Sequence, residues 1–160
     1  MNERIVSAKI QVYAFAELSE VEKNLITLAQ EATQRAYAPY SKFHVGAAAL
    51  LENGEIVTGN NQENAAYPSG LCAERVTLFF ANSKYPNVAV KTMAITAQTG
   101  GQFTEECTAP CGACRQVILE TENRFETPMR LLMAGREVVY AVESIKELLP
   151  LHFDKSSLKG

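Results

Sequence analysis

The sequence has no excess of positive charge, no long apolar run and no repeated or low-complexity segment. Its formal net charge is -3, so no basic surface is expected to gather nucleic acid by releasing counterions. No stretch is apolar over the roughly 20 residues that a membrane-spanning helix needs, and residues 1–18 do not resemble a signal peptide. We therefore expect a cytoplasmic protein that binds neither nucleic acid nor membrane.

Histidine is scarce, whereas the spacing of the cysteines is informative about their function. The two histidines, His44 and His152, lie in no pattern that is typical of metal ligands. The four cysteines could form two disulfides, but Cys111 and Cys114, with two residues between them, favour metal binding or redox chemistry. The chain has 160 residues, 47% of them apolar and 21% charged, which fits one domain with a substantial core.

The hydrophobic pattern predicts strands that alternate with helices. Residues 4–13 alternate imperfectly and suggest an edge strand within an N-terminal extension, residues 1–18. Ser19 and Glu22 form a capping-box pattern that begins a helix ending near Tyr37, and Asn53-Gly54 predicts a hairpin. Further strands are expected at 43–51, 55–59, 88–97, 129–133 and 137–142, with helices at 72–83, 111–120 and 144–149. We expect an α/β domain at 19–160.

Two short stretches contain the residues that could bind a metal ion or catalyse a reaction. Cys72-Ala73-Glu74-Arg75 and Pro110-Cys111-Gly112-Ala113-Cys114 together offer three thiolates and one carboxylate. A catalytic zinc ion typically has three protein ligands and an open position for water, whose pKa it lowers to about 7. Both stretches begin predicted helices, where free N–H groups stabilise thiolates. Arg75 would offset the negative charge of the cluster, and Glu74 would carry a proton from water to the substrate, as in zinc deaminases.

Other interpretations of the cysteines are less favoured. Cys111 and Cys114 alone could be a redox pair, but this would leave the pattern around Cys72 unexplained. A purely structural zinc site could recruit Cys107 as a fourth ligand, but Glu74 would then have no role. We interpret Cys107 as a free thiol in a loop.

Five motifs in a fixed order resemble those of the small, homotetrameric, zinc-dependent cytidine deaminases, over about residues 37–153. They read Ala38-Pro39-Tyr40-Ser41-Lys42-Phe43, Asn61-Gln62-Glu63-Asn64-Ala65-Ala66-Tyr67, Cys72-Ala73-Glu74-Arg75, Pro110-Cys111-Gly112-Ala113-Cys114-Arg115-Gln116 and Glu147-Leu148-Leu149-Pro150. The resemblance implies a three-layer α/β/α fold with a mixed sheet of about five strands, plus a possible added N-terminal strand.

The resemblance also implies roles for individual residues. Cys72, Cys111 and Cys114 would hold one zinc ion per subunit, Glu74 would shuttle protons, and Arg75 would hydrogen-bond the ligand thiolates. The implied substrate-binding residues are Asn61 and Glu63 at the ribose 3′-hydroxyl, Phe43 at the base, Ala73, and, from a neighbouring subunit, Ala65 and Tyr67 near the 5′-hydroxyl and Phe153 over the base.

The implied activity is the hydrolytic deamination of cytidine and 2′-deoxycytidine to uridine and 2′-deoxyuridine plus ammonia, in pyrimidine salvage. The implied assembly is a homotetramer with shared active sites. One alternative is a deaminase of the same fold acting on a polynucleotide or on a nucleoside like blasticidin S. Another is a non-enzymatic, zinc-stabilised interaction module. The acidic charge argues against a polynucleotide, and the segment 61–64 argues against the antibiotic.

Overall fold

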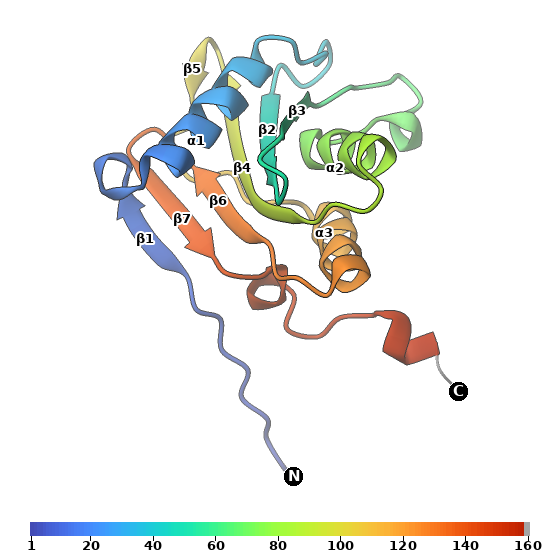
Figure 1. The fold of residues 1–160 in the computed structure, drawn as a ribbon. Coiled ribbons are helices and arrows are strands. Elements are labelled where there is room, and N and C mark those ends of the chain that lie inside the picture. The colour runs from blue at the N-terminus through green and yellow to red at the C-terminus, as the bar shows by residue number, and fades with distance from the viewer. Residues whose placement is uncertain (159–160) are drawn as a thin grey trace.

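The computed structural model describes residues 1–158 and is built on one mixed sheet of seven strands (Figure 1). The strands follow the spatial order β1-β7-β6-β4-β2-β3, with the short β5 beside β4. β4 and β6 are parallel, and every other neighbouring pair is antiparallel. The strands are β1 (Gln11–Ala14), β2 (His44–Leu51), β3 (Ile56–Asn60), β4 (Val90–Thr99), β5 (Gln102–Phe103), β6 (Arg130–Ala134) and β7 (Val138–Val142).

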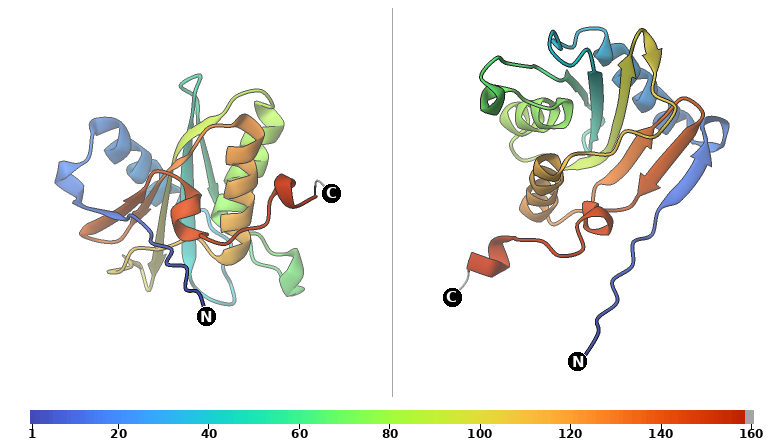
Figure 2. Two further views of the ribbon diagram at one scale, coloured as in Figure 1. Left: turned by 90° about the horizontal axis from the view of Figure 1, so that it is seen from below. Right: turned by 180° about the vertical axis from the view of Figure 1, so that it is seen from behind.

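Helices cover both faces of the sheet and confirm the three-layer α/β/α arrangement (Figure 2). Helix α1 (Glu20–Thr33) packs on one face, while α2 (Ala73–Lys84) and α3 (Gly112–Phe125) lie together on the other. The described residues also include four 3-10 helices: η1 (Phe15–Glu17), η2 (Tyr67–Ser69), η3 (Ile145–Leu148) and η4 (Lys155–Leu158). No helix within residues 1–158 is long and apolar enough to cross a membrane.

The alternation of side chains along β4 produces two separate cores. Met93 and Ile95 are fully buried beneath α2 and α3, whereas Ala94, between them, is buried beneath α1. Helix α2 lies directly against β3 because Gly59 has no side chain: a Cβ atom there would be 2.4 Å from the hydroxyl oxygen of Thr77. The first turn of α2, which carries Glu74, is therefore fixed at one end of the sheet.

The N-terminal extension forms an edge strand, but a shorter one than predicted. Only Gln11–Ala14 pairs with β7, and residues 1–10 are exposed without regular structure. Arg130 anchors the first residue of β1, because its guanidinium donates hydrogen bonds to the Gln11 side chain (2.7 Å) and to Glu22 of α1 (2.9 Å). Residues before the strand have no such anchor apart from the N–H of Lys9, which donates to Glu147.

Some predicted boundaries were wrong. Helix α1 begins with the predicted capping box but ends at Thr33 rather than near Tyr37. The strand predicted at 88–97 continues to Thr99 and turns back into the short β5. The short helix predicted at 144–149 is present as the 3-10 helix η3, Ile145–Leu148. Within the apolar run of α2, Leu78 is buried, whereas Phe79 and Phe80 are 48% and 53% exposed, because successive helical residues point about 100° apart.

Candidate metal centre and active site

The three cysteines predicted as metal ligands lie together at two adjacent helix starts. Cys72 is the N-cap of α2, Cys111 is the N-cap of α3, and Cys114 lies in the first turn of α3. Their Sγ atoms all lie within 4.8 Å of one another, with 3.9 Å between Cys72 and Cys111 and 3.5 Å between Cys111 and Cys114. The packing of α2 beside α3 therefore assembles the cluster.

The geometry of the cluster fits a zinc ion. A tetrahedral zinc ion with Zn–S bonds of about 2.3 Å places its sulfur ligands about 3.8 Å apart, close to the two distances above. The Arg75 side chain donates from Nη2 to the Cys72 sulfur at 3.7 Å, and its buried Nε has no partner within residues 1–158. Cys107 does not belong to the cluster, because its Sγ donates to the carbonyl of Val138 instead. This argues against a structural four-cysteine site.

The electrostatics of the cluster favour a thiolate even before metal is considered. A hydrogen bond from Cys114, helped by the Arg75 guanidinium and by Cys111, lowers the pKa of the Cys72 thiol to about 5. The same hydrogen bond, together with burial, raises the pKa of Cys114. Metal ligation requires thiolates, and this environment favours the thiolate form at Cys72.

Glu74 lies beside the cluster in the first turn of α2 and is only 4% exposed. Burial raises the pKa of its carboxyl group, and the neighbouring Cys72 thiolate raises it further. A carboxyl group with a raised pKa can both hold and release a proton near neutral pH, which suits a general acid and base. The position of Glu74 is therefore compatible with the predicted proton-shuttle role.

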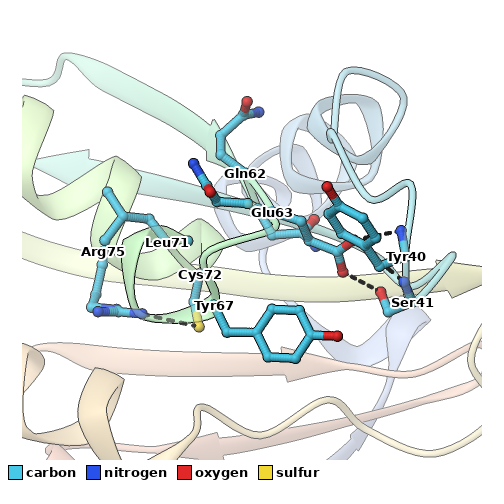
Figure 3. Close-up of a pocket in the computed structure, with 11 residues that line it drawn as sticks. Tyr40, Ser41, Gln62, Glu63, Tyr67, Leu71, Cys72 and Arg75 are labelled. Atoms are coloured by element: carbon cyan, nitrogen blue, oxygen red, sulfur yellow. Dashed lines mark hydrogen bonds between the residues drawn. The ribbon is translucent and has the colours of Figure 1, made fainter.

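A cavity of about 500 Å³ opens next to the cluster (Figure 3). Arg75 and Cys72 lie on one side of it, and Tyr40 and Ser41 lie on the other. The lining residues are Tyr40, Ser41, Asn61, Gln62, Glu63, Asn64, Tyr67, Gly70, Leu71, Cys72 and Arg75. This volume is in the range of small-molecule binding sites.

Two residues predicted to bind ribose, Asn61 and Glu63, line this cavity. The Asn61 amide also ties the loop to β2, because Nδ2 donates to the Phe43 carbonyl (2.9 Å) and Oδ1 accepts from the Val45 N–H (2.8 Å). A side-chain amide has two N–H donors and two acceptor lone pairs, so one of each stays available. Glu63 accepts hydrogen bonds from Ser41 and Tyr40, two residues of the first motif to which the sequence had assigned no role.

The other predicted substrate-binding residues do not all meet in one chain. Tyr67 lines the cavity and is 79% exposed, with its ring 6.5 Å from that of Tyr40 in an edge-to-face arrangement. Phe153, which is 58% exposed, belongs to the C-terminal segment, where its carbonyl accepts from Gln116 on α3. The remaining predicted residues outside the cavity lining are the half-exposed Phe43, the exposed Ala65 and the buried Ala73.

Comparison with known proteins identifies the family of this chain. Residues 19–126 match the cytidine and deoxycytidylate deaminase zinc-binding region. The chain is 41% identical over 139 residues to a cytidine deaminase of Sporosarcina psychrophila, covering 87% of this chain and 95% of that protein. It is 45% identical over 96 residues to a cytidine deaminase of Halalkalibacterium halodurans, covering 60% and 68% of the two chains.

Solved structures show the same similarity. The fold matches a cytidine deaminase from Burkholderia pseudomallei with a TM-score of 0.69 and 34% identity, over 85% of this chain and all of the other. A cytidine deaminase from Mycobacterium tuberculosis gives a TM-score of 0.65 and 32% identity, over 83% of this chain and 97% of the other. Fold and cysteine cluster thus define a zinc-binding α/β/α enzyme. The chain belongs to the cytidine and deoxycytidylate deaminase zinc-binding family.

Proposed function

We propose that this protein is a cytidine deaminase that converts cytidine and 2′-deoxycytidine, with water, to uridine and 2′-deoxyuridine plus ammonia. The observation that carries the proposal is the cluster of three cysteine sulfur atoms within 4.8 Å, next to the buried Glu74 and a cavity of about 500 Å³. The relatives named above, which are themselves cytidine deaminases, support the same reaction.

The chemistry divides between a metal and the side chains of this chain. Cys72, Cys111 and Cys114 would hold one zinc ion, which when bound acts as a Lewis acid on water. Glu74 accepts one proton of the attacking water at a carboxylate oxygen and delivers it to the base ring nitrogen, while the water oxygen bonds to the ring carbon that carries the amino group. It then transfers the remaining proton of the added hydroxyl to the amino group, whose C–N bond to the ring breaks to release ammonia. The positive charge of Arg75, which donates a hydrogen bond to the Cys72 sulfur, partly offsets the negative charge of the thiolates.

The sugar side of the cavity favours a nucleoside without phosphate. Asn61 and Glu63 bind the ribose 3′-hydroxyl, while Phe43 and Ala73 adjoin the base. Because a hydrogen bond from Ser41 lowers the pKa of Glu63, this carboxylate stays ionised at neutral pH and repels a phosphate group. We expect kcat/KM for cytidine to exceed that for cytidine monophosphate by at least about tenfold, corresponding to about 1.4 kcal/mol. Comparable values for the two would contradict this specificity.

The direct test is an ultraviolet assay of the conversion of cytidine to uridine by the zinc-loaded protein. Glu74→Ala provides the inactive control, because it removes the proposed proton shuttle and leaves all three thiols in place. Blasticidin S and single-stranded oligonucleotides containing cytosine test the alternative substrates. A protein that binds zinc stoichiometrically and deaminates none of these would instead be a zinc-stabilised interaction module.

We further propose a homotetramer in which neighbouring subunits complete each active site with Ala65, Tyr67 and Phe153. Large apolar side chains support association, since Tyr67, Phe79, Phe80 and Phe153 all stay substantially exposed in the single chain. Closed symmetric assemblies are the common arrangement for such contacts.

Mixing two inactive variants tests this shared site. Glu74→Ala lacks the proton shuttle, and Phe153→Ala lacks the aromatic that a neighbour would supply. If subunits exchange, some sites in mixed oligomers pair an intact Glu74 with an intact neighbouring Phe153, and activity should partly return. If sedimentation at the assay concentration showed a monomer, and if that monomer were fully active, the shared site would be contradicted. The proposed reaction would be unaffected.

A further inference from the structure

The carboxylate of Glu63 is held by the loop of residues 38–43, in particular by Ser41. Its Oε2 accepts hydrogen bonds from the backbone N–H groups of Tyr40 (2.9 Å) and Ser41 (3.3 Å). Its Oε1 accepts a short hydrogen bond from the Ser41 hydroxyl (Figure 3). A carboxylate offers about four lone-pair positions, two on each oxygen. Oε2 is therefore filled by the loop, and Oε1 keeps one acceptor position.

The Ser41 hydroxyl has a defined orientation. Its oxygen accepts a hydrogen bond from the Phe43 N–H (3.0 Å), so its own proton is directed to Glu63. The following residue, Lys42, has a left-handed backbone with φ of 57°, and its N–H donates to the Ala38 carbonyl at 3.1 Å. A non-glycine residue keeps this conformation only where its surroundings hold it. The loop is thus a fixed support for the carboxylate.

The charge of this arrangement determines what the cavity can recognise there. The Ser41 hydroxyl is the largest cause of the lowered pKa of Glu63, and the two backbone N–H groups add to it against a smaller effect of burial. An ionised carboxylate only accepts hydrogen bonds. Both Ser41 and Glu63 line the cavity that contains Cys72. A ligand hydroxyl can donate a hydrogen bond to the open position on Oε1, whereas an anionic group would be repelled by the carboxylate.

We propose that Ser41 is a positioning residue for sugar recognition, because its hydroxyl orients Glu63 so that Oε1 accepts a hydrogen bond from a ribose hydroxyl. The inference rests on the proposed function, in which Glu63 binds the sugar. In this role Ser41 need not contact the substrate, because it acts through the Glu63 carboxylate, which does.

The test compares the variants Ser41→Ala and Ser41→Thr on cytidine and on 2′,3′-dideoxycytidine, which lacks the 2′- and 3′-hydroxyls and keeps the 5′-hydroxyl. Ser41→Ala should lower kcat/KM for cytidine about tenfold, mainly by raising KM, because the bond to the charged carboxylate is lost. The same variant should change kcat/KM for dideoxycytidine less than about twofold. Ser41→Thr keeps a hydroxyl and should restore turnover of cytidine. Ser83→Ala is the matched control, since Ser83 is exposed and its hydroxyl has no bond within residues 1–158.

A second readout addresses the carboxylate directly. The pKa of Glu63, followed by carbon NMR of the labelled side chain, should rise in Ser41→Ala and stay unchanged in Ser83→Ala. Equal losses on both nucleosides, no loss on cytidine, or an unmoved Glu63 pKa would each overturn the role of Ser41 while leaving the deaminase function standing. If the unmodified zinc-loaded protein turned over neither nucleoside, the proposed function would be overturned, and the sugar-binding role of Ser41 with it.

Discussion

Replacing Glu74 by glutamine is expected to abolish nearly all deaminase activity while zinc and fold are retained. Glutamine has almost the same shape, so it fits the buried site in the first turn of α2, where Glu74 is 4% exposed. An amide, however, cannot take up and release a proton at pH 7. The substitution therefore separates the proton-transfer role from packing, and it leaves the three cysteine sulfur atoms in place.

The expected magnitude follows from the number of proton transfers. A positioned general acid or base typically contributes about 10²–10⁴-fold to a rate. Glu74 is the buried carboxyl group beside the cysteine cluster, and the reaction needs protons at both the ring nitrogen and the leaving amine. We expect kcat/KM to fall at least about 10³-fold, which corresponds to about 4 kcal/mol of transition-state stabilisation.

The measurement combines the ultraviolet assay with zinc analysis and thermal unfolding of the same preparation. Glu120→Gln serves as the matched control, because Glu120 is an exposed glutamate on α3 and lies outside the cavity lining. Activity of Glu74→Gln within tenfold of the unmodified protein would refute the proton-shuttle assignment. Loss of zinc together with activity would instead indicate that Glu74 binds or supports the metal.

Three further outcomes are expected. Cys111→Ala should lose zinc by metal analysis, whereas Cys107→Ala should keep it, because only the first sulfur belongs to the cluster; full zinc occupancy in the first variant would be evidence against this ligand set. Glu22→Gln should lower the free energy of unfolding in urea at pH 7 by about 1 kcal/mol. Burial raises the pKa of Glu22, but hydrogen bonds from Ser19 and Arg130 lower it below its ordinary value. The native carboxylate therefore stabilises the fold above the pKa of the unfolded chain, and the deficit should shrink as the pH falls through the native pKa. A deficit that stayed constant down to acid pH would contradict this linkage. Gly59→Ala should destabilise by about 1–3 kcal/mol, since its Cβ would lie 2.4 Å from a hydroxyl oxygen of α2; unchanged urea unfolding would show that helix and strand separate easily.

The starts of the functional helices could be predicted because their signals are local. Ser19 and Glu22 are three residues apart, and their capping box forms as the sequence indicated. The helix that begins after Cys72 and the one that begins at Pro110-Cys111 were likewise predictable within one or two residues. Such signals depend on hydrogen bonds between near neighbours, which form in the same way whatever the rest of the fold does.

Features that depend on contacts between distant parts of the chain could not be predicted from local sequence signals. The start of the short N-terminal strand is anchored by Arg130, more than 100 positions along the chain, which donates a hydrogen bond to the Gln11 side chain. The exposure of Phe79 and Phe80 depends on which side of α2 meets the sheet, and an apolar run alone does not specify that side. The role of Ser41 became visible only once its loop was placed against Glu63.

The sequence by itself determined the chemical types of the centre: three thiols, one carboxyl group and one arginine, in two stretches that begin helices. Tertiary structure alone decided that these stretches meet. Cys72 and Cys111 are 39 positions apart, and their sulfur atoms come within 3.9 Å because α2 and α3 pack side by side on one face of the sheet. Burial of apolar surface drives that packing, and it is a property of the whole chain rather than of either motif.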